Sequence, residues 1–455
     1  MSHYKSKAAA PAQSAFRRAR FANVLLILAF LIPATSLTLS AQKDNKSELS
    51  LAERVLVASK IYASIPIYFA HWQNVPGLDL DDAYKAYLTK VIAATDRRDF
   101  DLASIEFVAS LRNGHSGFED NWLNEHYGQP LGFYARPIKS EWVVTESSIP
   151  VLKPGDVIQR INDEPMEKFY REKQRWLFAS SDTARHQTLF LRSYLFPEAF
   201  TLTLDDGRVV SIDRSKMVAK DHAAPVKPEL RNGIEYIRIA SFDDPKFEFG
   251  AIDYLYKHRD ARTFIIDVRG NGGGNSPENL IRALMDRPFR EWSEGTPLTI
   301  GLFLAYQDLA KRPDLPAGFR NYMDAISTDF YQSQLLWAGS VKQPQEPIFT
   351  GELFILVDSD CASACEDFIA PFKDNHRATI IGESTMGSSG QPYYYDFGNG
   401  MSFRISTKRE YFPDGTAFEG IGVKPDIEVP LTLKDLKVGR DAALLKAEEM
   451  ARGGS

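Results

Sequence analysis

A serine near the start of a predicted helix is the first residue in this chain that could carry chemistry. The apolar run Leu353–Val357 is typical of a buried strand, and after a small polar turn helical spacing begins at Cys361. We therefore expect Ser363 on the first helical turn, where unpaired N–H groups and the positive helix end suit an anionic tetrahedral intermediate. On this stretch alone a helix-capping serine is the simpler interpretation, because serine is common at helix N-termini. Catalysis would need a base, an orienting acid and an oxyanion hole from elsewhere in the chain.

A glycine-rich turn could supply the oxyanion hole. The apolar run Thr263–Val268 leads into the sequence RGNGGG, which contains Gly272 and Gly273. The phosphate-binding pattern GxxxxGK[ST] is absent, whereas glycines let the backbone approach a substrate closely and present N–H groups. We expect the N–H groups of Gly272, Gly273 and Ala364 to form an oxyanion hole. A tight strand-to-helix turn would use the same glycines.

A histidine lies in a glycine-flanked turn far upstream of the serine. His115 stands in the sequence NGHSG, directly after the predicted helix Phe100–Leu111, so a tight and exposed turn is expected there. Imidazole can take and return a proton near neutral pH, which makes this residue a candidate base. Taken alone, a surface or capping histidine is the simpler interpretation.

Composition excludes several classes of function. The chain has 455 residues and a formal net charge of −6, so nucleic acid is not expected as a partner. Its eight histidines form no HExxH or similar cluster, and no Walker or Rossmann glycine pattern occurs, so no metal or nucleotide cofactor is expected. Cys361 and Cys365 flank the serine. We interpret them as small apolar residues packed beside the helix start, since a disulfide would be strained at this spacing.

The N-terminus has the layout of a secretory signal peptide. Three arginines between positions 17 and 20 precede the apolar segment Phe21–Ile32, and a small-residue stretch ends at Ala41. We expect residues 1–41 to be removed and the mature protein to be periplasmic or secreted. The apolar part is short for a spanning helix, so membrane contact is expected only if the segment stays uncleaved. A mitochondrial presequence is the alternative.

Three regions must position the candidate residues. The pattern is helical over 42–128 and predicts a bundle of three helices, the first broken by Pro66. A β-rich unit follows over 129–218. From 219 to 455 strand–turn–helix units recur, with an aromatic insertion at about 291–346 that could cap the site. Such repeated units indicate an α/β domain whose turns gather at one edge of the sheet.

The β-rich unit resembles a PDZ domain. It begins with PLGF, which places Leu131, Gly132 and Phe133 where the peptide-binding loop would be, and it continues with PGDVIQRINDEP. The resemblance implies that an extended peptide is added as a strand and that the loop N–H groups hold its terminal carboxylate. A small β domain that only packs against its neighbour is the alternative.

Four segments in the last two-fifths of the chain resemble the C-terminal-processing, or tail-specific, serine peptidase family. They read IIDVRGNGGG, DSDCASACEDF, RATIIGESTMG and YFPDGTAFEGIGVKPDIEV, in the family's order. The resemblance implies a crotonase-like catalytic domain, of the α/β class, and makes Ser363 the nucleophile.

The base distinguishes two branches of that family. Bacterial tail-specific members pair the serine with a lysine, but the matching position here is Ser388, and Lys408 is the nearest substitute in sequence. In the tricorn-like branch a histidine before the PDZ unit is the base, and an acidic residue just before the GxGVxPD segment orients it. His115 and Glu419 match those positions, so the resemblance implies a triad of Ser363, His115 and Glu419.

Residues and resemblance together predict an exported serine endopeptidase that hydrolyses polypeptide substrates through an acyl-enzyme, without a cofactor. Substrate C-termini would be recognised by the PDZ-like unit. A binding protein for a hydrophobic ligand or peptide is the alternative, because the family contains retinoid-binding members and the insertion at 291–346 is aromatic. An esterase or amidase is a third possibility. The sequence indicates neither the substrate nor the oligomeric state.

Overall fold

The computed structural model describes residues 48–218, 226–296, 300–309, 311–312, 320, 323, 335–337, 341–344 and 349–453. The predicted signal peptide, residues 1–41, and much of the predicted insertion at 291–346 lie outside this described part. Within it, no helix is both long and apolar enough to cross a membrane.

The first region contains the three predicted helices. They are α1 (Leu51–Tyr68), α2 (Leu80–Ala93) and α3 (Arg97–Ala109). Helix α1 begins where Ser50 and Glu53 each accept a hydrogen bond from the other's backbone N–H, which is a capping box. Pro66 lies inside the last turn of α1, and the helix continues beyond it to Tyr68, so the predicted break at Pro66 is not found.

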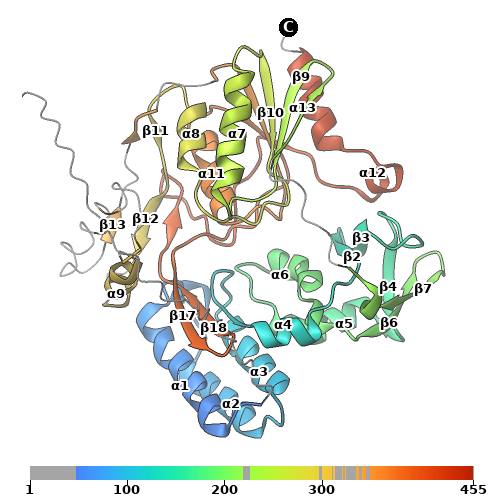
Figure 1. The fold of residues 1–455 in the computed structure, drawn as a ribbon, viewed down its shortest axis with the longest axis vertical. Helices are drawn as coiled ribbons and strands as arrows, with labels where there is room; N and C mark the ends of the chain where they lie inside the picture. Colours follow the sequence, from blue (N-terminus) through green and yellow to red (C-terminus); the bar gives the residue numbers. More distant parts are fainter. Residues whose placement is uncertain are drawn as a thin grey trace, which may run out of the picture. The chain divides into compact units, whose positions relative to one another are not determined.

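A short sheet joins this region to the far end of the chain. Strand β1 (Gly117–Asp120) pairs antiparallel with β18 (Met401–Ser406), which pairs with β17 (Pro392–Gly398). Helix α4 (Asn121–Tyr127) follows β1, and Figure 1 shows β17 and β18 beside α1. The pairing brings the turn that contains His115 to the C-terminal part of the chain.

The second sheet is built from residues 133–213. Its six strands follow the order β2–β3–β4–β6–β7, with β5 paired to β4, so β2 lies at an edge. The elements are β2 (Phe133–Ile138), β3 (Glu141–Ser147), β4 (Val157–Ile161), β5 (Glu164–Pro165), α5 (Met166–Lys173), α6 (Asp182–Thr188), β6 (Ala199–Leu204) and β7 (Val209–Asp213).

The third sheet has six strands in the order β20–β16–β15–β10–β9–β8. All neighbours are parallel except β8, which pairs antiparallel with β9 at one edge. The strands are β8 (Val226–Arg231), β9 (Ile234–Ile239), β10 (Thr263–Asp267), β15 (Glu352–Val357), β16 (Thr379–Gly382) and β20 (Ile427–Glu428).

Helices cover both faces of this sheet, because apolar side chains point alternately to one face and to the other. Phe264 and Ile266 pack into one core with α7 (Pro245–Lys257), α8 (Glu278–Leu284) and α11 (Ala364–Asp374). Ile265, which points to the other face, packs with α13 (Ala442–Gly453). Figure 1 shows α7, α8 and α11 on one side of β10 and α13 on the other. The central strands β10 and β15, apart from Glu352 at the start of β15, are buried on both faces, as their uninterrupted apolar runs predict.

The remaining elements are short. They are α9 (Ile300–Leu309), α12 (Leu433–Val438), β11 (Phe289–Arg290), β12 (Ser293–Thr296), β13 (Leu335–Trp337), β14 (Val341–Lys342) and β19 (Glu410–Tyr411), with single 3₁₀ turns at Trp72–Asn74, Gln174–Trp176, Leu189–Leu191, Ser193–Leu195 and Arg214–Lys216. The prediction of a mixed α/β fold is confirmed. The narrower names for its parts, crotonase-like, PDZ-like and helical bundle, stay predictions, as do the domain boundaries.

Candidate active site

Ser363 lies directly before α11 and not in its first turn. Its backbone angles are φ 55° and ψ −124°, a conformation that residues other than glycine rarely adopt. The expected helical position is therefore wrong by one residue, because this conformation cannot continue a helix. Two acceptors hold the turn: the Ser363 N–H donates to the Ser388 carbonyl at 2.9 Å and to Glu366 Oε2 at 3.2 Å.

His115 meets Ser363 although 248 residues separate them in the chain. Its Nε2 lies 3.1 Å from Ser363 Oγ. The turn that carries His115 is held by Asn113, whose Oδ1 accepts the His115 N–H at 3.0 Å and the Ser116 hydroxyl at 2.9 Å. Burial, together with the nearby Arg404, His71 and Lys408, lowers the pKa of His115 to about 3. A neutral imidazole that faces a serine hydroxyl can accept its proton.

Two serines stand between His115 and Glu419. Ser388 Oγ lies 2.8 Å from His115 Nδ1 and 3.4 Å from Ser180 Oγ, and Ser180 donates to Glu419 Oε1 at 2.5 Å. The direct contact expected in a triad is not found: no hydrogen bond joins His115 and Glu419 in the described part of the chain. The bare Cα of Gly114 makes room for the hydroxyl, since a Cβ there would lie 2.5 Å from Ser388 Oγ.

Glu419 is also connected to the backbone of His115, through Asn113. Its Oε1 accepts a hydrogen bond from Asn113 Nδ2 at 3.0 Å, and Asn113 in turn holds the His115 N–H. Burial raises the pKa of Glu419 to about 8, and hydrogen bonds from Ser180 and the Ser389 backbone oppose the rise. The carboxyl group is therefore connected to both the ring and the main chain of His115.

Lys408 is engaged elsewhere. Its Nζ lies 2.6 Å from Glu410 Oε1. Burial lowers the pKa of Lys408, but Glu410, Tyr306 and Glu294 together outweigh burial and raise this pKa well above its usual value. A protonated lysine cannot act as a base. Among the residues that the structure describes, Lys408 has no hydrogen bond to Ser363, so the geometry favours the histidine.

The predicted oxyanion donors divide into two groups. The N–H of Gly273 is already used, because it donates to Asn271 Oδ1 at 2.9 Å. Gly273 instead permits close approach: its φ is +99°, and a Cβ there would lie 2.7 Å from Ser363 Cβ. Its expected role as a donor is thus corrected to a steric one. The N–H groups of Gly272 and Ala364 have no hydrogen-bond partner within the described ranges.

The predicted peptide-binding loop is partly occupied by its own chain. Leu131 and Phe133 are buried, and the Gly132 carbonyl accepts hydrogen bonds from the N–H and hydroxyl of Ser148, both at 2.8 Å. None of Leu131, Gly132 and Phe133 has a hydrogen bond to Ser363, His115 or Glu419 in the described structure.

The two cysteines are buried free thiols. Cys361 Sγ and Cys365 Sγ lie 3.2 Å and 3.8 Å from the same acceptor, the Val268 carbonyl. Burial raises the pKa of both thiols, so they remain protonated. They pack beside the nucleophile turn as expected.

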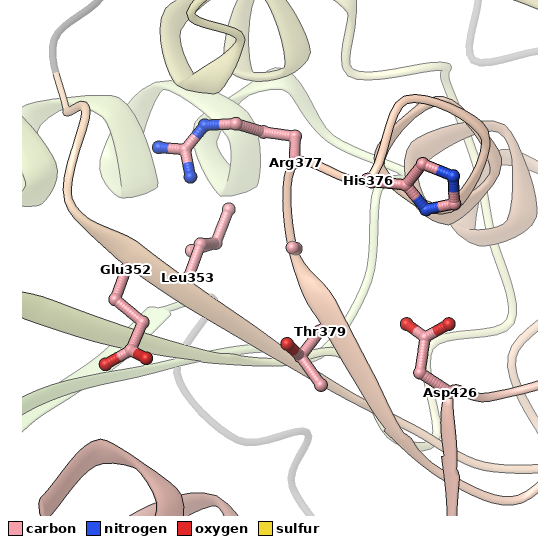
Figure 2. Close-up of a pocket in the computed structure, with 7 residues that line it drawn as sticks. Glu352, Leu353, His376, Arg377, Thr379 and Asp426 are labelled. Carbon is pink, nitrogen blue, oxygen red and sulfur yellow. The ribbon is translucent and has the colours of Figure 1, made fainter. Parts of the chain in front are cut away.

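A hollow of about 290 Å³ lies at the opposite end of the same strands (Figure 2). Glu352 and Thr379 open β15 and β16, whereas Ser363 follows the C-terminal end of β15. The Arg377 guanidinium beside the hollow donates to the carbonyls of Leu284, Gly351 and Phe349, so it is already satisfied. The chemistry-bearing residues do not line this hollow.

Sequence reasoning missed several members of the network. Glu366 could have been found, because Ser363 and Glu366 form the S-x-x-E pattern of a helix N-terminus. Asn113 stands next to the candidate histidine in the NGHSG sequence. No local signal marks Ser180, which reaches Glu419 across 239 residues. Ser388 was noted only as the place of a missing lysine.

Comparison with known families gives an independent result. Residues 304–429 match the model of peptidase family S41. The matched segment contains Ser363, Ser388 and Glu419, while His115 lies outside it.

Relatives and solved structures agree with the S41 match. The carboxy-terminal-processing protease of Bartonella bacilliformis is 33% identical over 96 residues, which are 21% of this chain and 22% of that protein. The chloroplastic carboxyl-terminal-processing peptidase 2 of Arabidopsis thaliana is 26% identical over 280 residues, 61% of this chain and 46% of that one. The chain thus spans less than half the length of these curated relatives.

The structure of mature CPAF complexed with lactacystin superposes with a TM-score of 0.65, covering 88% of this chain and 98% of that one at 14% identity. This likeness shows a shared fold. The family match and the names of the relatives support a serine-type peptidase.

Proposed function

We propose that this protein is an exported serine endopeptidase that cleaves polypeptides through an acyl-enzyme on Ser363. The observation that carries the proposal is the 3.1 Å contact between His115 Nε2 and Ser363 Oγ. A serine hydroxyl becomes nucleophilic when a base lies within hydrogen-bond reach, and here the base is a neutral imidazole.

The residues divide the reaction as follows. Ser363 Oγ attacks the peptide carbonyl carbon while His115 Nε2 takes its proton, and the N–H groups of Gly272 and Ala364 stabilise the oxyanion. His115 then protonates the leaving amine, and water hydrolyses the ester. The hydrogen bonds from the ring to the acid can run in one direction. His115 Nδ1–H donates to the Ser388 hydroxyl, the Ser388 hydroxyl donates to the Ser180 hydroxyl, and the Ser180 hydroxyl donates to Glu419. Glu419 would therefore orient the imidazole indirectly.

Substrate docking on the second sheet belongs to the same proposal. Strand β2 is an edge strand, and Tyr134 on it donates to the Gln187 carbonyl of α6 at 3.0 Å, so a strand edge runs beside a helix. An extended substrate could add to such an edge. Cleavage of one peptide with a free and with an amidated C-terminus tests carboxylate recognition: equal rates would contradict it.

The proposed reaction is tested with casein and the mature chain from residue 42. We expect cleavage by the wild type, a loss of roughly 10⁴-fold or more in Ser363→Ala and His115→Ala, and full activity in the control Ser193→Ala. Ser193 is a suitable control because its hydroxyl donates to the Gly128 carbonyl, away from the candidate site. Undiminished cleavage by Ser363→Ala would overturn the assignment.

A further inference from the structure

A buried carboxylate joins the nucleophile turn to the loop that contains Ser388. Glu366, in the first turn of α11, is 0% exposed. Its Oε2 accepts the N–H of Ser363 at 3.2 Å and that of Ser388 at 2.9 Å. Its Oε1 accepts the N–H of Gly387 at 2.7 Å and the hydroxyl of Thr385.

The four donors require a group that only accepts. Each carboxylate oxygen receives two hydrogen bonds, which an ionised carboxylate can satisfy with its lone pairs. An amide of the same shape would turn an NH₂ group toward two of these donors. The Thr385 hydroxyl also accepts the Val423 N–H at 2.7 Å, so the carboxylate is linked to the segment just beyond Glu419.

The two segments that Glu366 joins also contact each other directly. The Ser363 N–H donates to the Ser388 carbonyl, and the Met386 N–H donates to the Cys361 carbonyl, both at 2.9 Å. The Ser363 turn has a positive φ of 55°, a strained conformation that persists only where neighbours hold it. On the same loop, Ser388 Oγ lies 2.8 Å from His115 Nδ1.

We propose that Glu366 is a positioning residue of the active site, which fixes Ser388 against His115 while it holds the Ser363 turn. This role rests on the proposed peptidase function. A carboxylate that only caps α11 would stabilise the helix and leave the histidine unaffected.

A double-mutant cycle separates these roles. We expect Glu366→Gln to lower kcat about 100-fold with KM nearly unchanged, as for a displacement near 1 Å. Ser388→Ala should lower kcat about 10-fold, the loss of one hydrogen bond. If Glu366 acts through Ser388, the double variant should be no slower than Glu366→Gln alone. If the double variant instead lowers kcat about 1,000-fold, the product of the two single losses, the two residues act independently and the proposal is overturned.

Glu448→Gln is the matched control. Glu448 is a buried carboxylate on α13 that accepts hydrogen bonds from Arg231 at 3.0 Å and Asn232 at 3.1 Å. We expect this variant to lose stability and keep kcat. If Glu366→Gln does not fold, Thr385→Val removes a single donor and should lower kcat about 10-fold.

A signal that needs no turnover separates this proposal from the peptidase assignment. The His115 ring resonances, assigned by their loss in His115→Ala, should shift alike in Glu366→Gln and Ser388→Ala. These shifts in a protein without Ser363-dependent cleavage would overturn the peptidase assignment and keep the positioning role. An active enzyme whose His115 signals and kcat are unchanged in Glu366→Gln would overturn the positioning role alone.

Discussion

At the scale of single residues, burial keeps the imidazole of His115 neutral. Its pKa is lowered to about 3, mainly because the ring is removed from solvent and also because Arg404, His71 and Lys408 lie nearby. Glu419, the acid predicted to orient the histidine, is connected to the ring through hydrogen bonds of Ser388 and Ser180. At neutral pH the imidazole of His115 can therefore accept a proton without first having to lose one.

This protonation state predicts the pH profile. A histidine with an ordinary pKa would lose activity as the pH falls through about 6.5. Because the pKa of His115 is depressed, the imidazole stays neutral well below that value, and kcat/KM should keep its plateau down to about pH 5. A profile of peptide cleavage between pH 4 and 9 measures this. An acid limb centred near 6.5 would contradict it.

The bridging hydroxyl of Ser180 predicts a second effect. Ser180→Ala removes the donor to Glu419 and should lower kcat about 10-fold, the value of one hydrogen bond. Steady-state kinetics on a peptide substrate checks this, with Ser193→Ala as the control. Equal rates in both variants would show that the connection to Glu419 contributes nothing to turnover.

At the scale of elements, two strand–turn–helix connections place Ser363 beside the glycine-rich turn. Strands β10 and β15 are parallel neighbours, so the turns that follow them meet at one edge of the sheet. Gly273 follows β10, and Ser363 follows β15. A Cβ at Gly273 would lie 2.7 Å from both Ser363 Cβ and the Ala362 carbonyl oxygen.

We therefore expect Gly273→Ala to lower kcat more than 100-fold, because the turn must move by about an ångström. Gly207→Ala is the control: its φ of +83° is comparably strained, but a Cβ there meets nothing within 4 Å. It should cost about 1 kcal/mol of stability and leave kcat unchanged. Kinetics and urea unfolding of both variants test the pair. Similar kcat values would contradict the steric role.

Much of the element level was predictable, whereas the connections between elements were not. Apolar runs such as Thr263–Val268 and Leu353–Val357 predict strands, because that signal is local. The Ser363 turn was misplaced by one residue, since a positive φ at a serine has no sequence signature. The bridge through Ser388 and Ser180 depends on contacts across more than 200 residues, which periodicity does not report.

At the scale of the whole molecule, one buried arginine connects the second sheet to the third. Arg136 on β2 is 6% exposed. It donates to Ser359 Oγ at 2.6 Å and to Glu383 Oε2 at 2.7 Å, on the segments that follow β15 and β16. The edge strand proposed for substrate docking is thus tied to loops next to the nucleophile.

Arg136→Met should destabilise the protein by about 3 kcal/mol, because it leaves Glu383 without its partner. Adding Glu383→Gln should recover part of that loss, since the unpaired charge is removed. Arg208→Met, which breaks exposed ion pairs with Asp156 and Asp206, should cost much less stability than Arg136→Met. Urea unfolding of the wild type and the three variants measures these differences. Equal losses at Arg136 and Arg208 would contradict the proposed connection.

The central claim is that Ser363 is a nucleophile activated by His115. Labelling with a fluorophosphonate probe, followed by mass mapping of the modified peptide, tests it most directly. We predict one adduct on the wild type, located at Ser363, with labelling slowed at least 100-fold in His115→Ala and abolished in Ser363→Ala. A folded wild-type protein that takes up no probe, or an adduct that persists in Ser363→Ala, would contradict the account.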